Sequence, residues 1–212
     1  MNHCLRCVVA VFFAGTAALA HAGTDDAWYG GIGAGVFEPK ESPGQLTNGD
    51  GEGALMFDLG YRKSRYLRFE LDATFAEQDV DTPAGVTAGL FSAVRPRSDL
   101  TTVGLGGLVK VGYPVGPIEP YAGLGAGIYF SQLTVSGSLL GESKTHEEDD
   151  TGLGQQLLAG MDVHMNDHLS IGAEFRRVYL KAGFGALTNG KVDVGGDSVL
   201  LTVRWTPGEA RH

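Results

Sequence analysis

Apolar and polar residues alternate with a period of two in eight segments of the chain, and this pattern predicts eight β-strands. In the clearest segment Leu55, Phe57 and Leu59 share one face, while Asp58 and Arg62 share the other. Glycine is frequent in these segments, which disfavours helices because glycine is a poor helix former. The predicted strands are 27–37, 53–63, 66–76, 99–113, 119–131, 152–165, 169–180 and 197–206.

The connections between these segments alternate between long and short. The long ones are 38–52, 77–98, 132–151 and 181–196, and the others are short turns. Outer-membrane barrels show this asymmetry, with short periplasmic turns and longer external loops. The pattern therefore predicts an all-β fold, an eight-stranded antiparallel up-and-down transmembrane β-barrel. Both termini are expected in the periplasm.

The N-terminus has the features of an export signal. Arg6 precedes an apolar run over 8–20, which ends at Ala20-His21-Ala22, the small-x-small pattern of a signal-peptidase site. We expect residues 1–22 to be a cleaved signal peptide and 23–212 to be the outer-membrane barrel domain. Both cysteines precede the predicted cleavage site, so the mature chain is expected to have no disulfide and no cysteine metal site. After Ala22 no apolar run approaches the length of a transmembrane helix.

The alternation alone does not say which face of the strands points inward. A soluble barrel would bury the apolar face, whereas a membrane barrel exposes it to lipid. Strands of about 10–13 residues, tilted by about 40°, span the roughly 25 Å apolar band of a membrane barrel. Aromatic residues also gather near the expected strand ends, as in the girdles of membrane barrels. The predicted aromatic girdle is Trp28, Tyr61, Tyr113 and Trp205 on the periplasmic side, with Phe75 and Phe130 on the outer side.

The charged face of the strands carries equal numbers of acids and bases. Facing lipid at mid-depth, one Arg or Lys costs about 2–4 kcal/mol, whereas opposite charges facing inward can pair. The predicted interior charge network is Asp58, Arg62, Arg68, Glu70, Asp72, Lys110, Asp162, Glu174, Arg176 and Arg204. By the same alternation the side chains of Lys63 and Arg177 are expected to point outward. Both residues lie near strand ends, where long side chains reach water.

Glycines fall on the inner parity of three strands: Gly31, Gly33 and Gly35; Gly104 and Gly106; and Gly123, Gly125 and Gly127. Eight strands leave an interior just wide enough for side chains. Glycine at these positions is expected to make room for the Arg and Tyr side chains of facing strands.

The segment Pro120-Tyr121-Ala122-Gly123-Leu124-Gly125-Ala126-Gly127 resembles the Pro-Tyr-x-Gly-x-Gly-x-Gly strand of the OmpA/OmpX-like family of small outer-membrane barrels. The segment 169–175 (LSIGAEF) is similar to the next upward strand of that family. The resemblance implies a barrel inserted by the outer-membrane assembly machinery, with no catalytic residue to carry over. Members of the family usually end on an aromatic residue, whereas here Trp205 is followed by seven more residues, 206–212.

Four groups of residues could carry chemistry. His168 and Ser170 have the His-x-Ser spacing of lipid A deacylases, but they begin a strand at the periplasmic end and also suit a hairpin turn. The acidic run 146–150 could bind Ca²⁺ or bridge to lipopolysaccharide through divalent ions, but we expect it to be a solvated loop. His164 is expected to join the interior polar network rather than to bind a metal. Arg95 and Arg97 form a small basic feature in the second long loop. No catalytic residue, metal site or cofactor is predicted.

The net charge of −9, without a basic run, argues against a nucleic-acid partner. The leading hypothesis is a monomeric outer-membrane barrel that is not an enzyme, with a structural or surface-interaction role, long external loops and a charge-paired, largely closed interior. Its expected partners are outer-membrane lipid, lipopolysaccharide and the assembly machinery. The alternatives are a narrow channel for ions or small solutes, a lipid A-modifying enzyme and a soluble periplasmic binding barrel.

Overall fold

The computed structural model describes residues 26–39, 51–80, 97–139, 142–183 and 191–207. The predicted signal peptide lies outside the described residues. Ten strands are present in this part of the chain. They are β1 (Ala27–Pro39), β2 (Gly51–Arg62), β3 (Leu67–Val80), β4 (Arg97–Gly112), β5 (Ile118–Leu139), β6 (Glu142–His164), β7 (Leu169–Tyr179), β8 (Lys181–Gly183), β9 (Lys191–Asp193) and β10 (Gly196–Trp205).

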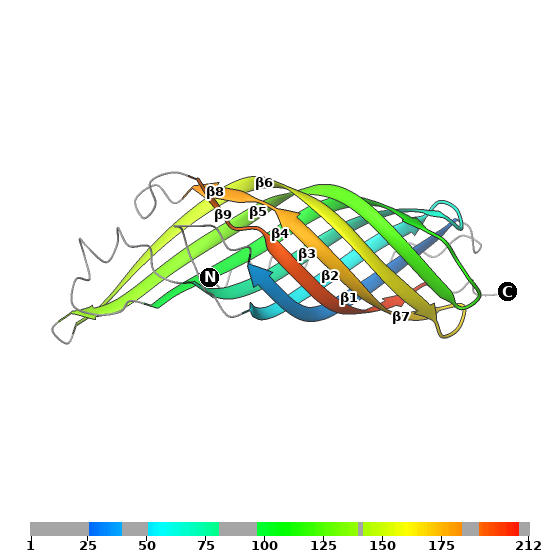
Figure 1. Cartoon of the computed structure of the whole chain (residues 1–212), viewed down its shortest axis with the longest axis horizontal. Helices are drawn as coiled ribbons and strands as arrows, with labels where there is room; N and C mark the ends of the chain where they lie inside the picture. The colour runs from blue at the N-terminus through cyan, green and yellow to red at the C-terminus, as the bar shows by residue number, and fades with distance from the viewer. Residues whose placement is uncertain (1–25, 40–50, 81–96, 140–141, 184–190, 208–212) are drawn as a thin grey trace.

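Eight of these strands form one closed antiparallel barrel, in the order β1-β10-β7-β6-β5-β4-β3-β2 (Figure 1). Along the chain each barrel strand pairs with the next barrel strand, and β7 therefore pairs with β10. The short strands β8 and β9 lie between these two in sequence and form a separate two-stranded sheet. The barrel closes where β1 pairs with β10, from Gly30↔Trp205 to Pro39↔Gly196. The predicted eight-stranded up-and-down barrel is therefore confirmed.

The two faces of every barrel strand differ because successive side chains point to opposite sides. Large apolar side chains cover the outside, and many of them are more than half exposed, among them Ile32, Leu71, Leu124, Leu153 and Leu201. The lumen holds the alternate positions, where most of the buried polar and charged residues lie. A soluble barrel would need the opposite arrangement, so that alternative is wrong.

Three short connections lie together at one end of the barrel, here called the turn end; the opposite end is called the loop end. Their sequences favour tight turns, because Ser64 and Asn166 accept hydrogen bonds from backbone N–H groups two and three residues later. Gly116 adopts a positive φ of 61°, which glycine reaches without a steric penalty. The three connections are 63–66, 113–117 and 165–168.

The expected third long loop, 132–151, is mostly strand. β5 and β6 pair without interruption from Ile118↔Val163 to Leu139↔Glu142. β7 begins to pair with β6 only at Gln155, and β4 pairs with β5 only as far as Ser136, so the β5–β6 hairpin extends beyond β7 and its tip extends beyond β4 (Figure 1). We call residues 131–139 and 142–151 the hairpin arm.

The acidic run belongs to this arm, so the expectation that it forms a solvated loop is wrong. Glu147 to Asp150 pair across the strands with Thr134 to Ser131, which are uncharged. No like charges therefore stand directly opposite each other, and successive acids point to opposite faces. The repulsion on which the loop prediction relied is weak in this geometry.

Smaller differences occur at other strand ends. β3 continues to Val80 and β4 begins at Arg97, so the expected loop 77–98 is shorter. The last expected loop, 181–196, contains β8 and β9, which pair through Ala182↔Val192. Arg95 lies outside the described residues. In the described part of the chain no helix is long and apolar enough to cross a membrane.

Candidate functional site in the barrel interior

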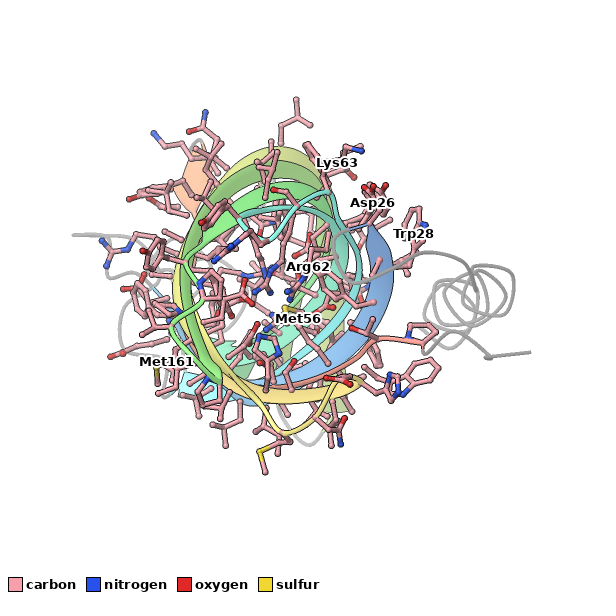
Figure 2. The ribbon with its side chains drawn as sticks, turned by 90° about the vertical axis from the view of Figure 1, so that its right-hand side faces the viewer. Asp26, Trp28, Met56, Arg62, Lys63 and Met161 are labelled. Atoms are coloured by element: carbon pink, nitrogen blue, oxygen red, sulfur yellow. The ribbon has the colours of Figure 1, made fainter. Side chains whose placement is uncertain are left out.

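The lumen contains all ten residues of the predicted charge network. Nine of them are at most 3% exposed. The tenth, Arg62, lies at the turn end with 23% of its side chain exposed. Figure 2 looks into the barrel from this end: Arg62 and Met56 lie inside the ring of strands, whereas Trp28, Lys63 and Met161 lie outside it.

At the turn end, three cationic or basic side chains converge on one carboxylate, Glu119. Its Oε2 lies 3.2 Å from Arg62 Nη2 and 2.8 Å from His164 Nε2. Its Oε1 pairs with Arg68, which also donates to Asp162 at 2.9 Å. Four strands contribute to this cluster, so it ties the mouth of the barrel together across the lumen.

Arg204 forms the centre of the next layer. Its guanidinium group donates to Asp162 at 2.6 Å, to Glu174 at 3.0 Å and to Asp58 at 3.3 Å. It also donates to the hydroxyl of Tyr121 at 3.2 Å. Each of these partners comes from a different strand. The planar fork of arginine donors suits such a site, where several acceptors surround one cation.

Lys110 lies beside Arg204 and bridges two carboxylates. Its Nζ is 2.6 Å from Glu70 and 2.8 Å from Glu174, and the Lys110 side chain is fully buried. Tyr29 donates to the second oxygen of Glu70 at 2.8 Å. An uncompensated charge is costly at this depth, so each group depends on its partners.

Arg176 forms the layer nearest the loop end. It pairs with Asp72 and with Glu174, the latter at 2.8 Å, and it donates to Gln156 Oε1 at 2.8 Å. Beyond Arg176 the lumen becomes apolar. Phe37, Ala54, Met56 and Leu200 pack into one buried cluster there. A small cavity of about 40 Å³ lies between this cluster and Arg176.

Three interior tyrosines each lie directly opposite a glycine on the neighbouring strand. The pairs are Tyr29↔Gly60, Tyr121↔Gly160 and Tyr129↔Gly104. A Cβ added at Gly160 would lie 2.5 Å from the hydroxyl of Tyr121, and one at Gly104 would lie 2.5 Å from the ring of Tyr129. Glycine at these positions therefore leaves the space that the tyrosine rings occupy.

The predicted aromatic girdle lies on the outside of the barrel. Trp28 packs against Tyr61 at 5.1 Å between ring centroids, and Tyr113 stacks on Tyr66 at 6.0 Å. Both pairs lie at the turn end, where Trp205 ends β10. Tyr66 was missing from the prediction. Phe75 and Phe130 lie nearer the loop end, on one cross-strand row with a valine between them.

Lys63 also lies outside the barrel at the turn end, where it pairs with Asp26 at 3.1 Å. Tyr61 donates its hydroxyl to the same carboxylate at 2.8 Å. The Tyr61 hydrogen bond, followed by the one from Lys63, lowers the pKa of Asp26 below its usual value. Lys63 therefore points outward but pairs with an exposed carboxylate at the end of the barrel.

The residues considered for catalysis do not form a hydrogen-bonded pair in the described part of the chain. His168 is exposed in the third turn, where its backbone N–H bonds Asn166 Oδ1 at 2.9 Å, and Ser170 is buried at the start of β7. His164 contacts Glu119, as a member of the interior network would. Among the described residues, no group of three or more potential ligands is placed to bind a metal.

The sequence analysis missed several members of the network. Glu119 is the most important, because it contacts three of the basic residues at the turn end. Its position has the same parity as Tyr121 and Gly123, so the alternation on β5 could have identified it. Gln156 also lies in the lumen on a predicted inner position, where it accepts a hydrogen bond from Arg176.

The chain matches the family model described as outer membrane protein β-barrel domain over residues 7–206. It therefore belongs to this family, whose members are barrels of the cell outer membrane. Comparison with curated protein sequences gave no match.

Solved structures of outer-membrane proteins have the same fold. Neisserial surface protein A, from Neisseria, is 19% identical over 84% of this chain and 96% of its own, with a TM-score of 0.54. OprG from Pseudomonas aeruginosa is 17% identical over 87% and 98%, with a TM-score of 0.57. A major outer membrane protein from Thermus thermophilus is 15% identical over 85% and 100%, with a TM-score of 0.51. At these identities the likeness concerns the fold alone.

Proposed function

We propose that this outer-membrane barrel has a structural or surface-interaction role and does not catalyse a reaction. The observation that supports this proposal is the filled lumen, in which ion pairs cross the interior between strands that are not neighbours in the barrel. We further propose that the protein is a monomer, with the turn end and both termini in the periplasm and the loop end outside. Short turns on the periplasmic side are typical of outer-membrane barrels.

The interior favours a plug over a pore. Lys110, Arg176 and Arg204 lie side by side in the lumen, and each contacts Glu174. A charged pore lining faces water, whereas these side chains are at most 3% exposed. A wide channel would also need about twice as many strands. Together these features support a closed scaffold that displays its loop end.

The hairpin arm supports a role at the surface. It lies beyond the reach of β7, β4 pairs with its β5 side only as far as Ser136, and it carries the acidic residues Glu147 to Asp150. With the loop end outside, this arm would face lipopolysaccharide and the surroundings of the cell. Lipopolysaccharide and outer-membrane lipid are the partners that we propose, together with the assembly machinery during insertion.

The first test is the mobility of the mature protein from isolated outer membranes on gels in SDS, unheated against boiled. A folded membrane barrel resists cold SDS, so we expect a shift in apparent mass on boiling. The scaffold proposal also predicts that the purified protein leaves planar bilayers electrically silent. Single-channel currents would contradict the closed interior, while a missing shift would contradict the membrane barrel itself.

A second candidate function is a narrow channel, which one observation favours. Cavities lie at both ends of the charged layers, about 310 Å³ at the turn end and about 40 Å³ towards the loop end. A path between them would have to cross the Arg204 layer. Under this hypothesis Arg68→Glu changes the conductance, whereas bilayers that are silent before and after the substitution exclude it.

The absence of catalysis has its own test. Overexpression of the wild-type chain is expected to leave the lipid A profile of the cell unchanged. Deacylated lipid A that disappears with His168→Ala or Ser170→Ala would overturn this part of the proposal.

A further inference from the structure

The mouth of the barrel at the turn end contains a cavity of about 310 Å³. We call it the turn-end cavity. Its walls come from the turn-end parts of β1, β2, β3, β5, β6, β7 and β10 and from all three short turns. The side chains that matter for its chemistry are Arg62, Arg65, Arg68, Glu119, His164 and His168.

Basic groups outnumber acidic ones around this cavity. In the described part of the chain its carboxylates are Glu119 and Asp167. Glu119 faces Arg62, Arg68 and His164, and of these Arg68 also pairs with Asp162 of the deeper layer, whereas Arg62 has no second carboxylate among the described residues. Arg204 also lines the cavity, but its guanidinium group is already surrounded by acids of the deeper layer. The excess positive charge therefore lies at the mouth.

Several arginine donors at the mouth have no acceptor among the described residues. Arg62 is bound to Glu119 only through Nη2, at 3.2 Å, and it is partly open to solvent. Arg68 Nε is buried without a hydrogen-bond partner, on a side chain that is 2% exposed. Arg65 is exposed and lies over the ring of Tyr66 at 4.9 Å, without an ion pair in this part of the chain. Unsatisfied donors of buried groups are uncommon in folded proteins.

We propose that the turn-end cavity binds a small oxyanion, a phosphate or a carboxylate, between Arg62 and Arg65 with Arg68 behind it. The guanidinium fork matches the planar or tetrahedral oxygens of such a group and holds them by two parallel hydrogen bonds. The oxyanion completes the charge balance that Glu119 leaves incomplete. No bond is made or broken, so the site serves for binding and not for catalysis.

The site does not depend on whether the barrel conducts or which partners meet its loops. The same phosphate chemistry has two sources at this end of the barrel, a soluble phosphate and the headgroup of a phospholipid. The position of Arg62 inside the ring of strands favours the soluble form (Figure 2). Arg65, at the tip of a turn, is the residue that a headgroup would reach.

The test follows the arginine Nε–Hε signals by NMR while inorganic phosphate is added to the folded barrel in maltoside micelles at constant ionic strength. We expect saturable shifts at Arg62 and Arg68. Arg177 is the matched control, because it is exposed, far from the cavity, and paired with Asp197. Shifts that stay linear with concentration, or that are equal at Arg177, overturn the site.

Two variants with opposite expected effects sharpen the test. Arg62→Gln removes a charged donor and should weaken phosphate binding at least about tenfold, since charge-assisted bonds to phosphate are strong. Glu119→Gln removes the competing carboxylate and should tighten binding. Arg177→Gln should leave the affinity unchanged. Gel mobility in cold SDS verifies that each variant is folded, and unchanged affinity in folded Arg62→Gln overturns the proposal.

A second arm identifies the source of the oxyanion. The same protein is transferred to phosphatidylglycerol bilayers without free phosphate. Shifts at Arg62 and Arg68 on this transfer identify a lipid headgroup as the occupant, while shifts only on phosphate addition identify a soluble oxyanion. Either result supports the site. No shift under both conditions overturns it.

Discussion

Replacing Lys110 with methionine tests whether the interior network holds the barrel together. Methionine keeps the length of the side chain and removes its charge. Glu174 keeps Arg176 at 2.8 Å and Arg204 at 3.0 Å. Glu70 loses its ion pair with Lys110 at 2.6 Å and keeps the hydroxyl of Tyr29. The substitution therefore leaves one carboxylate buried without a cation.

Breaking a buried ion pair by removing one partner costs about 3–5 kcal/mol. We expect Lys110→Met to lower the free energy of unfolding by about this amount. Urea titration in phospholipid vesicles, followed by tryptophan fluorescence, provides the measurement. With a slope of about 1–3 kcal/mol/M, a loss of 3 kcal/mol moves the midpoint by roughly 1–3 M. The control is Lys63→Met, because Lys63 and its partner Asp26 are both more than half exposed.

A second substitution tests whether the loss of stability comes from the unpaired Glu70 carboxylate or from lost packing around residue 110. In Lys110→Met with Glu70→Gln, the buried negative charge is gone and the amide can still accept the tyrosine hydrogen bond. We expect this double variant to recover about 1–3 kcal/mol relative to Lys110→Met, the usual range for coupled neighbours. A loss below about 1 kcal/mol in the single variant, the range of an exposed pair, would refute the reasoning. So would a double variant no more stable than the single one.

The remaining predictions concern the tyrosine–glycine pairs and the outer face of the turn end. Gly60→Ala pushes a methyl group into the tyrosine ring opposite and should destabilise the barrel by about 1–3 kcal/mol, whereas Gly53→Ala meets nothing within 4 Å and should be neutral in the same urea titration. Because the pKa of Asp26 is lowered by Tyr61 and Lys63, its contribution to stability is present above the usual carboxyl pKa and is lost as the pH falls through the lowered value. Lys63→Met should raise the pKa of Asp26 in an NMR titration, and an unchanged pKa would show that this ion pair is absent in solution.

The face of each strand could be predicted from sequence because the side-chain period in a strand is two. Leu55 and Asp58 fall on opposite faces in the pattern and in the barrel alike. The pairing partners could not be predicted in this way. Arg176 and Asp72 are 104 residues apart, and they meet because the tilt and the stagger of the strands bring them to one depth.

The hairpin arm shows the limit of composition as a guide. The run Glu147 to Asp150 looks like a loop when its charges are considered alone. Its conformation depends on the partner strand, which presents small or neutral side chains such as Ser131 and Thr134. Sequence reasoning that treats each segment separately does not include this pairing, so the strand was missed.

The tyrosine–glycine pairs help to fix the register in which neighbouring strands pair. A slip of one residue between strands would turn apolar side chains into the lumen, so the alternation already excludes it. A slip of two residues keeps every side chain on its proper face, and the alternation does not oppose it. Such a slip would place Tyr29 opposite Asp58 or Arg62 instead of Gly60. On the β5–β6 seam the same slip would place Tyr121 opposite Leu158 or Asp162 instead of Gly160. The Tyr29–Gly60 and Tyr121–Gly160 pairs thus distinguish the native stagger from the neighbouring staggers that the binary pattern permits.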